Sequence, residues 1–200
     1  MPPTTDLIIL FHGISASGAQ MMPLATTWKK SLPTTRFATP DAPFRKAVGP
    51  GRLWFQVDGN QLRPDRLAEI RNAFDRTVAQ IINREGYEEA LDRVAFVGVS
   101  QGAIVALDAI ASGRWKVGAL IGYSGLLPPL PVSSDGSGTP VLLVHGQNDR
   151  TIPPFASTLA ASLLQAAGFE VDLKIEPGVG HTISMMGARF GLDFLRTHLG

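Results

Sequence analysis

The sequence predicts an α/β fold: a mostly parallel sheet of about six strands, flanked by helices. Short apolar runs alternate with helical patterns along the whole chain, as is typical of parallel strands joined by right-handed crossovers. The hydrophobic content of 44% is that of a globular protein with a substantial core. No repeat, long linker or break in composition divides the chain, so residues 1–200 are expected to form a single domain.

The expected strands are apolar runs bounded by turn residues. In chain order they are Leu7–Phe11, Arg36–Thr39, Val94–Gly98, Ala119–Tyr123, Val141–His145 and Val171–Ile175. The expected helices have apolar residues at helical spacing. They are Ala19–Ser31, Arg66–Glu85, Gln101–Ser112, Phe155–Ala167 and Ser184–His198. Pro153 and Pro154 would open the fourth helix, and Gly168 would end it.

Two segments lack both patterns and are predicted to be loops. The range 40–62 contains prolines, glycines and the pair Trp54-Phe55, and the range 124–140 is rich in Pro, Gly and Ser. Ligands bind at the carboxyl ends of the strands in an open α/β sheet, so each loop is either a pocket wall or a solvated connector. Within the second loop, Leu126–Val132 is a lid, a dimer contact or neither, and the chain is expected to be a monomer or a homodimer.

Composition and charge exclude several classes of protein. The net charge is +1 and the basic residues are scattered, so no nucleic-acid partner is expected. The absence of cysteine excludes disulfides, thiolate metal sites and a cysteine nucleophile. No apolar run is long enough to span a bilayer, and Leu7–Phe11 is too short for a signal-peptide core. The sequence therefore predicts a cytoplasmic protein without stable membrane insertion.

A candidate nucleophile lies where a predicted strand meets a predicted helix. Residues 98–102 have the sequence Gly-Val-Ser-Gln-Gly, with Ser100 at the centre. This pattern at a strand-to-helix turn is typical of a nucleophile elbow, in which a strained serine is raised above the edge of the sheet. The flanking glycines let the strand and the helix approach closely. Ser100 is therefore expected to attack a substrate carbonyl.

A serine hydroxyl needs a base to accept its proton and a carboxylate to orient that base. In an elbow-type site these groups follow the serine in the order acid, then histidine. Asp149 comes after the strand 141–145, and His181 lies in a Gly/Pro-rich loop after the last predicted strand. The order predicts a triad of Ser100, Asp149 and His181. Taken singly, Asp149 also suits a turn, and His181 also suits an ordinary loop.

Backbone amides are expected to stabilise the negative charge that develops on the carbonyl oxygen. One donor is predicted to be the N–H of Gln101, where the dipole of the following helix adds to its effect. The second is expected from the loop after the first strand, and Ile14 is favoured because Gly13 lets that loop turn close to the substrate. His12 is expected to hold the same loop by hydrogen bonds rather than to act as a base.

Metal and nucleotide chemistry are not predicted. His12, His145 and His181 lie far apart in the sequence and lack the short spacing of a helical zinc site. No glycine-rich phosphate-binding loop opens a helix after the first strand. The sequence therefore predicts no metal and no cofactor.

With these residues in place, the chain resembles the phospholipase/carboxylesterase family of α/β-hydrolases, which includes acyl-protein thioesterases and small bacterial carboxylesterases. The elements that carry the resemblance are, in order, Phe11-His12-Gly13, Pro40-Asp41-Ala42-Pro43, Trp54-Phe55, Gly98-Val99-Ser100-Gln101-Gly102, His145-Gly146-Gln147-Asn148-Asp149 with Pro153, and Gly180-His181-Thr182-Ile183-Ser184. The match spans nearly the whole chain. The first strand begins so early that the antiparallel strands which commonly lead this fold are expected to be minimal or missing.

The resemblance implies the same triad, oxyanion amides at Ile14 and Gln101, and an acyl groove near Trp54, Phe55 and the loop after Tyr123. It also implies hydrolysis of small-molecule carboxylic esters with short to medium acyl chains. The apolar residues expected to line the pocket, each of which also suits the core, are Ile14, Trp54, Phe55, Leu126, Leu127 and Met185.

Two other functions remain open. The first is hydrolysis of acyl thioesters or lysophospholipids, as in members of the same family. The second is a non-catalytic protein of the same fold that binds an ester or a small hydrophobic ligand without turning it over. The intact set of Ser100, Asp149 and His181 argues against the second function, because a binding protein has no need of all three.

Overall fold

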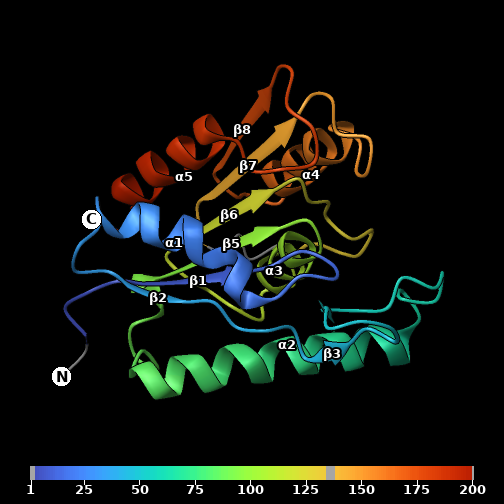
Figure 1. Cartoon of the computed structure of the whole chain (residues 1–200), viewed down its shortest axis with the longest axis horizontal. Helices are drawn as coiled ribbons and strands as arrows, with labels where there is room; N and C mark the ends of the chain where they lie inside the picture. The colour runs from blue at the N-terminus through green and yellow to red at the C-terminus, as the bar shows by residue number, and fades with distance from the viewer. Residues whose placement is uncertain (1–2, 134–137, 200) are drawn as a thin grey trace.

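The structure is a computed structural model that describes residues 3–133 and 138–199. Its main sheet has six parallel strands in the order β2-β1-β5-β6-β7-β8 (Figure 1). Their bounds are β1 Leu7–Phe11, β2 Arg36–Ala38, β5 Val94–Val99, β6 Ala119–Tyr123, β7 Val141–Gly146 and β8 Val171–Glu176. Every predicted strand is confirmed to within one residue at each end. No antiparallel strand precedes β1 in the described part of the chain.

The helices also follow the prediction, with one difference at the first. They are α1 Met22–Lys29, α2 Pro64–Glu85, α3 Gln101–Ala111, α4 Phe155–Ala166 and α5 Met185–His198, with short 3₁₀ turns η1 Gly18–Met21 and η2 Leu91–Arg93. The predicted helix over 19–31 is divided between η1 and α1. Pro23 lies in the first turn of α1, where its missing N–H is tolerated, so the regular helix begins beside it.

The predicted loop over 40–62 contains a feature that the sequence did not indicate. Two strands of two residues each, β3 Phe44–Arg45 and β4 Arg52–Leu53, pair antiparallel. Strands this short show no periodic pattern, which is why the prediction missed them. The second predicted loop, 124–140, forms no helix or strand in its described residues, and 134–137 lie outside them.

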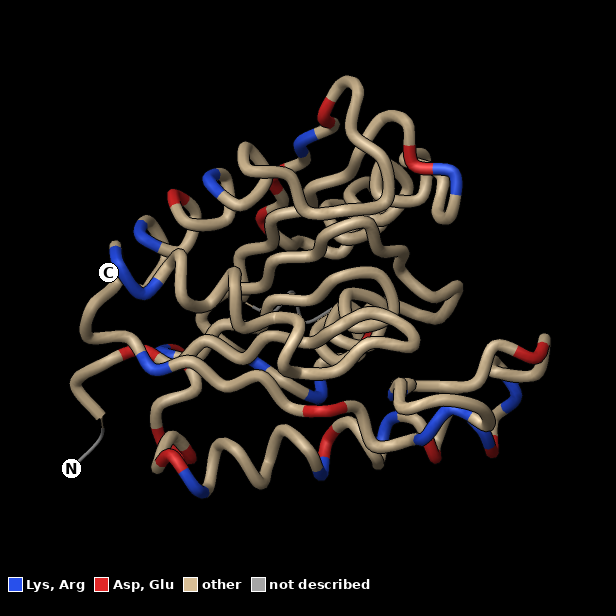
Figure 2. Tube along the Cα trace, in the orientation of Figure 1, with Lys and Arg blue, Asp and Glu red and all other residues tan. Residues whose placement is uncertain are grey.

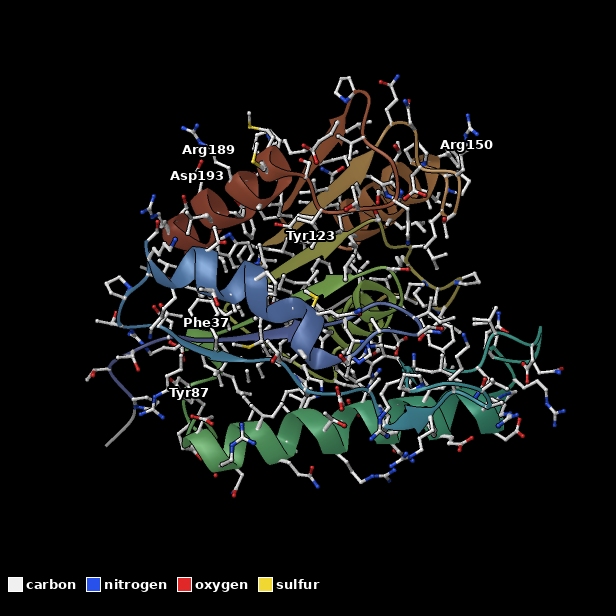
Figure 3. The ribbon with its side chains drawn as sticks, in the orientation of Figure 1. Phe37, Tyr87, Tyr123, Arg150, Arg189 and Asp193 are labelled. Atoms are coloured by element: carbon white, nitrogen blue, oxygen red, sulfur yellow. The ribbon has the colours of Figure 1, made fainter. Side chains whose placement is uncertain are left out.

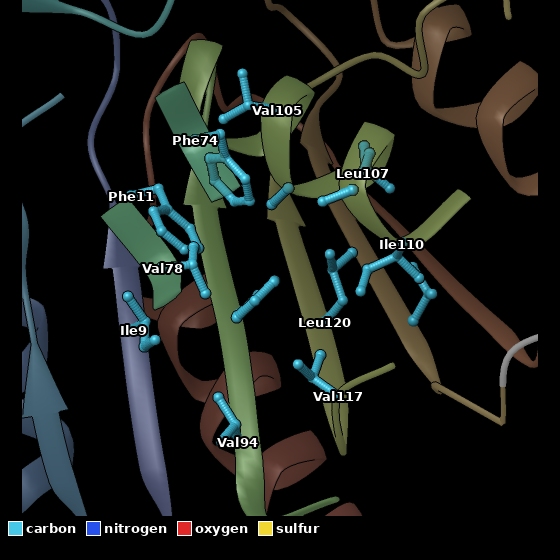
Figure 4. Close-up of a cluster of buried hydrophobic side chains, with 14 of the residues drawn as sticks. Ile9, Phe11, Phe74, Val78, Val94, Val105, Leu107, Ile110, Val117 and Leu120 are labelled. Atoms are coloured by element: carbon cyan, nitrogen blue, oxygen red, sulfur yellow. The ribbon is translucent and has the colours of Figure 1, made fainter. Parts of the chain in front are cut away.

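Alternation along the strands sends side chains to two different layers. Leu7, Ile9 and Phe11 of β1 pack with α2, α3 and α4, whereas Ile8 and Leu10 pack with α1 and α5. Figure 4 shows the first cluster, in which side chains of α2 and α3 meet those of β1, β5 and β6. Both faces of the sheet are therefore covered, which explains why its strands are continuous apolar runs.

Charged residues lie mainly on the outer helices and loops (Figure 2). On α5, for example, Arg189 and Asp193 point away from the sheet, with 3.8 Å between guanidinium and carboxylate (Figure 3). None of the helices in the described part of the chain combines the length and the apolar character that a membrane span requires.

The parallel sheet brings distant segments together at one edge. Because all six strands run in the same direction, the loops that follow β1, β5, β7 and β8 leave from their carboxyl ends. These four loops contain Gly13, Ser100, Asp149 and His181, respectively. The fold thus gathers the predicted site residues along one edge.

Candidate active site

Ser100 occupies a strained turn between β5 and α3. Its backbone has φ 53° and ψ −118°, a conformation that non-glycine residues rarely adopt. Its N–H donates a 2.9 Å hydrogen bond to the carbonyl of Tyr123, which fixes the turn against β6. A Cβ at Gly98 would lie 2.5 Å from the backbone of Ala103, and one at Gly102 would collide with the carbonyl of Phe11. Only glycine fits these two positions, as the elbow prediction requires.

The three residues of the predicted triad are in direct contact. His181 Nε2 lies 3.0 Å from Ser100 Oγ, and His181 Nδ1 lies 2.6 Å from Asp149 Oδ2. Since the carboxylate only accepts, Nδ1 carries the imidazole proton and Nε2 is free to accept the proton of the serine. This tautomer is the one that a general base at Ser100 needs.

Asp149 is held as a carboxylate by three hydrogen-bond donors, with His145 close to one of its oxygens. Its Oδ1 accepts hydrogen bonds from the N–H groups of Thr151 at 2.8 Å and Ile152 at 3.0 Å, while Oδ2 accepts from His181 and lies 3.2 Å from His145 Nε2. Burial by itself raises the pKa of Asp149, but the hydrogen bonds from His181, Ile152 and Thr151 outweigh it and hold this pKa below its ordinary value. The group is therefore ionised at neutral pH.

His145 packs beside Asp149 and fixes the segment around it. Its ring is buried, with Nε2 at 2.8 Å from the carbonyl of Ile152 and Nδ1 at 2.6 Å from Ser157 Oγ. A carbonyl only accepts, so Nε2 carries a hydrogen and the hydroxyl of Ser157 donates to Nδ1. His145 thus ties the loop after β7 to the start of α4.

The two predicted oxyanion donors flank Ser100. The N–H of Gln101 is at the first position of α3, and the loop after β1 passes beside the serine, since a Cβ at Gly13 would lie 4.0 Å from Ser100 Oγ. Within the described residues, neither the N–H of Gln101 nor that of Ile14 has a hydrogen-bond partner. Both amides therefore have a hydrogen left for a ligand to accept.

The side chains of His12 and Trp54 fix the loop after β1. His12 Nε2 accepts a 2.9 Å hydrogen bond from the N–H of Ala42, and its Nδ1 lies 2.7 Å from the carbonyl of Gly13. The indole N–H of Trp54 donates to the carbonyl of His12 at 2.9 Å. Burial lowers the pKa of His12, against a smaller opposing effect of its bond to Gly13, so the ring is neutral. The predicted structural role of His12 fits these contacts.

A cavity of about 510 Å³ opens beside Ser100, and its lining is largely apolar. Four of the predicted site residues besides Ser100 line it, namely Ile14, Phe55, Gln101 and Leu126. A second cavity of about 540 Å³ lies elsewhere, among charged residues such as Asp6 and Lys116, and does not contact the triad. The cavity beside Ser100 is therefore the candidate substrate pocket.

Three residues predicted to line the pocket lie outside it. The side chain of Trp54 is 1% exposed and packs in the core against Phe11. Leu127 lines a separate groove against α4. Met185 starts α5 and is 93% exposed, pointing into solvent. An apolar residue in a loop can face the core, the pocket or solvent, and its sequence position does not distinguish these directions.

Most of the pocket wall was not predicted from the sequence. The lining residues that were not candidates are Val57, Gln61, Leu62, Leu67, Ile70, Ile104, Val105, Asp108, Pro128, Pro129, Thr151 and Ile152. A signal was present in α3, because Ile104, Val105 and Asp108 lie four, five and eight residues after Ser100 and so share its helical face. The lining residues in the loops have no regular spacing that would have predicted their position in the pocket wall.

No metal site accompanies the triad in the part of the chain that the structure describes, since no three His, Cys, Asp or Glu side chains there are grouped to hold an ion.

Known proteins are similar to this chain in sequence and in fold. The chain is 28% identical to esterase YpfH of Escherichia coli (strain K12) over 196 residues, which are 97% of this chain and 83% of that protein. It is also 28% identical to acyl-protein thioesterase 1 of Eremothecium gossypii over 212 residues, covering 98% of this chain and 89% of that protein. The crystal structure of esterase PE8 has a TM-score of 0.80 and 30% identity, covering 100% of this chain and 97% of that chain.

Comparison with protein families assigns the chain to a family of esterases as well. A model of the phospholipase/carboxylesterase family matches residues 2–199, which is nearly the entire chain. The resemblance noted from motifs alone is thereby confirmed, as is the α/β-hydrolase fold with its six-stranded parallel sheet. The chain belongs to the phospholipase/carboxylesterase family and is a carboxylesterase-type enzyme.

Proposed function

We propose that the protein hydrolyses carboxylic esters with short to medium acyl chains through an acyl-enzyme at Ser100. The observation that carries this proposal is the continuous contact from Ser100 Oγ to His181 Nε2 at 3.0 Å and from His181 Nδ1 to Asp149 Oδ2 at 2.6 Å. These contacts supply a nucleophile, a base and an orienting carboxylate in one line.

In the first half-reaction, Ser100 Oγ attacks the ester carbonyl carbon while its proton passes to His181 Nε2. The tetrahedral intermediate then collapses, the bond to the alcohol oxygen breaks, and His181 returns the proton to that oxygen. In the second half-reaction, water gives a proton to His181 and attacks the acyl group. The second tetrahedral intermediate collapses, the bond to Ser100 Oγ breaks, and His181 returns the proton to that oxygen, so one ester and one water yield one acid and one alcohol.

The amides of Gln101 and Ile14 stabilise the oxyanion in both half-reactions. Their N–H groups are free of other partners in the described residues, and Gln101 stands at the positive end of the α3 dipole. Loss of one such donor typically raises a barrier by about 3 kcal/mol. Asp149 stabilises the imidazolium that His181 becomes when it holds the serine proton.

The pocket supports an uncharged acyl chain. Most of the residues around the cavity of about 510 Å³ are apolar, including Phe55, Leu67, Ile70, Ile104 and Leu126. Such a lining favours an aliphatic group over a charged one, because a charge buried there would find no free side chain of opposite charge.

Acyl thioesters are the second candidate substrates. The relative named acyl-protein thioesterase 1 covers almost the entire chain, and the same Ser100 attack cleaves a thioester with a thiolate as leaving group. Lysophospholipids are a third class that fits the family. A non-catalytic ligand-binding role has no support in the geometry, because binding alone does not require the contacts of His181.

The test is a panel of p-nitrophenyl esters from acetate to decanoate, with a palmitoyl thioester beside them. We expect turnover of the esters by the wild-type protein and its loss in Ser100→Ala. The matched control is Ser162→Ala, which removes an exposed serine on α4, away from the cavity. Labelling by a fluorophosphonate probe provides a second readout, since it requires an activated Ser100 but no particular acyl chain.

Each outcome distinguishes the candidates. Preference for the thioester by kcat/KM would move the assignment to a thioesterase. Saturable binding of esters by a folded protein, without turnover and without labelling by the probe, would overturn the enzymatic proposal in favour of ligand binding.

A further inference from the structure

One face of α3 forms a wall that leads away from the nucleophile. Ser100, Ile104, Val105 and Asp108 all line the same cavity, and their spacing puts them on one side of the helix. From Ser100 to Asp108 the helix rises about 12 Å. The cavity therefore extends along α3 for roughly this length, with the reacting carbonyl expected at the Ser100 end.

The opposite wall comes from α2, which lies beside α3 on the same side of the sheet (Figure 1). Leu67 and Ile70 of α2 line the cavity, and Arg71 follows directly in the sequence. The two helices are bridged at this point by a bidentate pair, in which Arg71 Nη2 donates to Asp108 Oδ1 at 2.7 Å and Nε donates to Oδ2 at 3.0 Å.

The carboxylate of Asp108 has no free oxygen to offer a ligand. Arg71 contacts both oxygens, and Arg114 Nη1 adds a 2.9 Å hydrogen bond to Oδ2. Asp108 is 7% exposed and is the one charged residue among those that line the cavity in the described chain. Because both carboxylate oxygens already accept from arginines, the ion pair at the end of the apolar wall would block an acyl chain instead of binding a polar ligand.

We propose that the Arg71–Asp108 pair closes the far end of the pocket and sets the upper limit of acyl-chain length. This inference rests on the proposed ester hydrolysis at Ser100. An extended chain advances about 1.2 Å per bond, so about 12 Å of helix accommodates an acyl chain of roughly eight to ten carbons. A longer chain would have to strip water from the pair or separate its charges, both of which are unfavourable.

The variant that tests the proposal is the double substitution Arg71→Leu/Asp108→Leu. Changing both residues leaves neither charge of the pair buried alone, and Arg114 keeps its 3.0 Å contact with Asp75. The matched control is Asp75→Asn. Asp75 of α2 also binds an arginine, Arg114, which follows the end of α3, but Asp75 does not line the cavity, and asparagine keeps an acceptor for the Trp115 indole.

Two measurements are made on each protein. The first is kcat/KM for p-nitrophenyl butanoate, octanoate and tetradecanoate. The second is the Kd of the free fatty acids of the same lengths, determined by calorimetry with Ser100→Ala added to each protein. The binding measurement needs no turnover. If the protein does not hydrolyse esters, every ester will remain intact, but the Kd values will still show whether the pocket limits chain length.

We expect the wild type and Asp75→Asn to discriminate against the tetradecanoyl chain by about tenfold or more relative to octanoyl, in both measurements. The double variant is expected to lose most of this discrimination, because the pair that limits the chain is then absent. An unchanged ratio in a folded double variant, or equal use of both lengths by the wild type, would overturn the proposal. If the double variant does not fold, Arg71→Gln/Asp108→Asn takes its place, because it removes both charges while the asparagine oxygen still accepts from Arg114.

Discussion

The side chain of Gln101 accepts a 2.8 Å hydrogen bond from the backbone N–H of Trp54. Its amide nitrogen also donates to the carbonyl of Phe55 at 2.7 Å. The buried side chain of the residue after Ser100 therefore fixes the segment that contributes Phe55 to the pocket.

Substitution of Gln101 by methionine is expected to destabilise the fold. The variant keeps the backbone amide and a similar side-chain volume but leaves the buried N–H of Trp54 and carbonyl of Phe55 unpaired. The expected cost is about 2–4 kcal/mol in the free energy of unfolding, measured by urea denaturation. The exposed Gln56→Met is the control, with a change within about 0.5 kcal/mol. Equal stability of the two variants would contradict this role for Gln101.

Asp149→Asn is expected to lower kcat by about 10⁴ while the protein stays folded. The N–H groups of Thr151 and Ile152 point at Oδ1, so the asparagine oxygen will occupy that position and its NH₂ will face His181. His181 Nδ1 must then accept, which places the proton on Nε2, where it can no longer take the proton of Ser100. Steady-state kinetics with p-nitrophenyl butanoate measures the loss, and a kcat within tenfold of the wild type would contradict the predicted tautomer.

The fold and the contacts among Ser100, Asp149 and His181 were predictable because each depends on strong local patterns. The buried strands are continuous apolar runs, and the elbow around Ser100 needs glycines at fixed positions for steric reasons. The order of Ser100, Asp149 and His181 then follows from the order of the strands. The short pair of β3 and β4 gave no such pattern.

The pocket wall was less predictable because it depends on side-chain direction. Trp54 was expected in the pocket, yet its indole N–H donates to the carbonyl of His12, and its ring is buried in the core. Met185 was expected there too, but it precedes the first inward-facing residue of α5, Gly187, and stays in solvent. The ion pair of Asp108 was not predicted, because its partner Arg71 lies 37 positions away in the sequence.

Protonation of His12 is expected to make stability depend on pH. The pKa of folded His12 lies below its ordinary value of 6.5, because the ring is buried and its Nε2 accepts from Ala42. Its contribution is therefore fully present above pH 6.5 and is lost as the pH falls from there through the folded pKa, because the unfolded chain takes up the proton first. Urea unfolding of the wild type and of His12→Gln measures this at several pH values. The wild type should lose stability more steeply on acidification, and parallel curves would contradict the assignment.

Ser184 is expected to position His181 without contacting substrate. It caps α5, where its Oγ accepts from the N–H of Gly187 at 2.8 Å and donates to Glu176 Oε2 at 2.6 Å. Glu176 ends β8 and is buried, so this contact joins both ends of the loop that contains His181. Ser184→Ala removes the cap and leaves a buried carboxylate oxygen without its donor, which is expected to lower the free energy of unfolding by about 1–3 kcal/mol.

The same substitution separates positioning from mere stability through kinetics. A looser loop moves the Nε2 of His181 away from Ser100, so Ser184→Ala should lower kcat at temperatures where the protein is fully folded, while KM changes little because the cavity beside Ser100 does not include Ser184. Ser184→Thr retains the hydroxyl and should restore kcat. If the alanine variant kept the wild-type kcat, the contact with Glu176 would serve stability alone, and the position of His181 would depend on Asp149 instead.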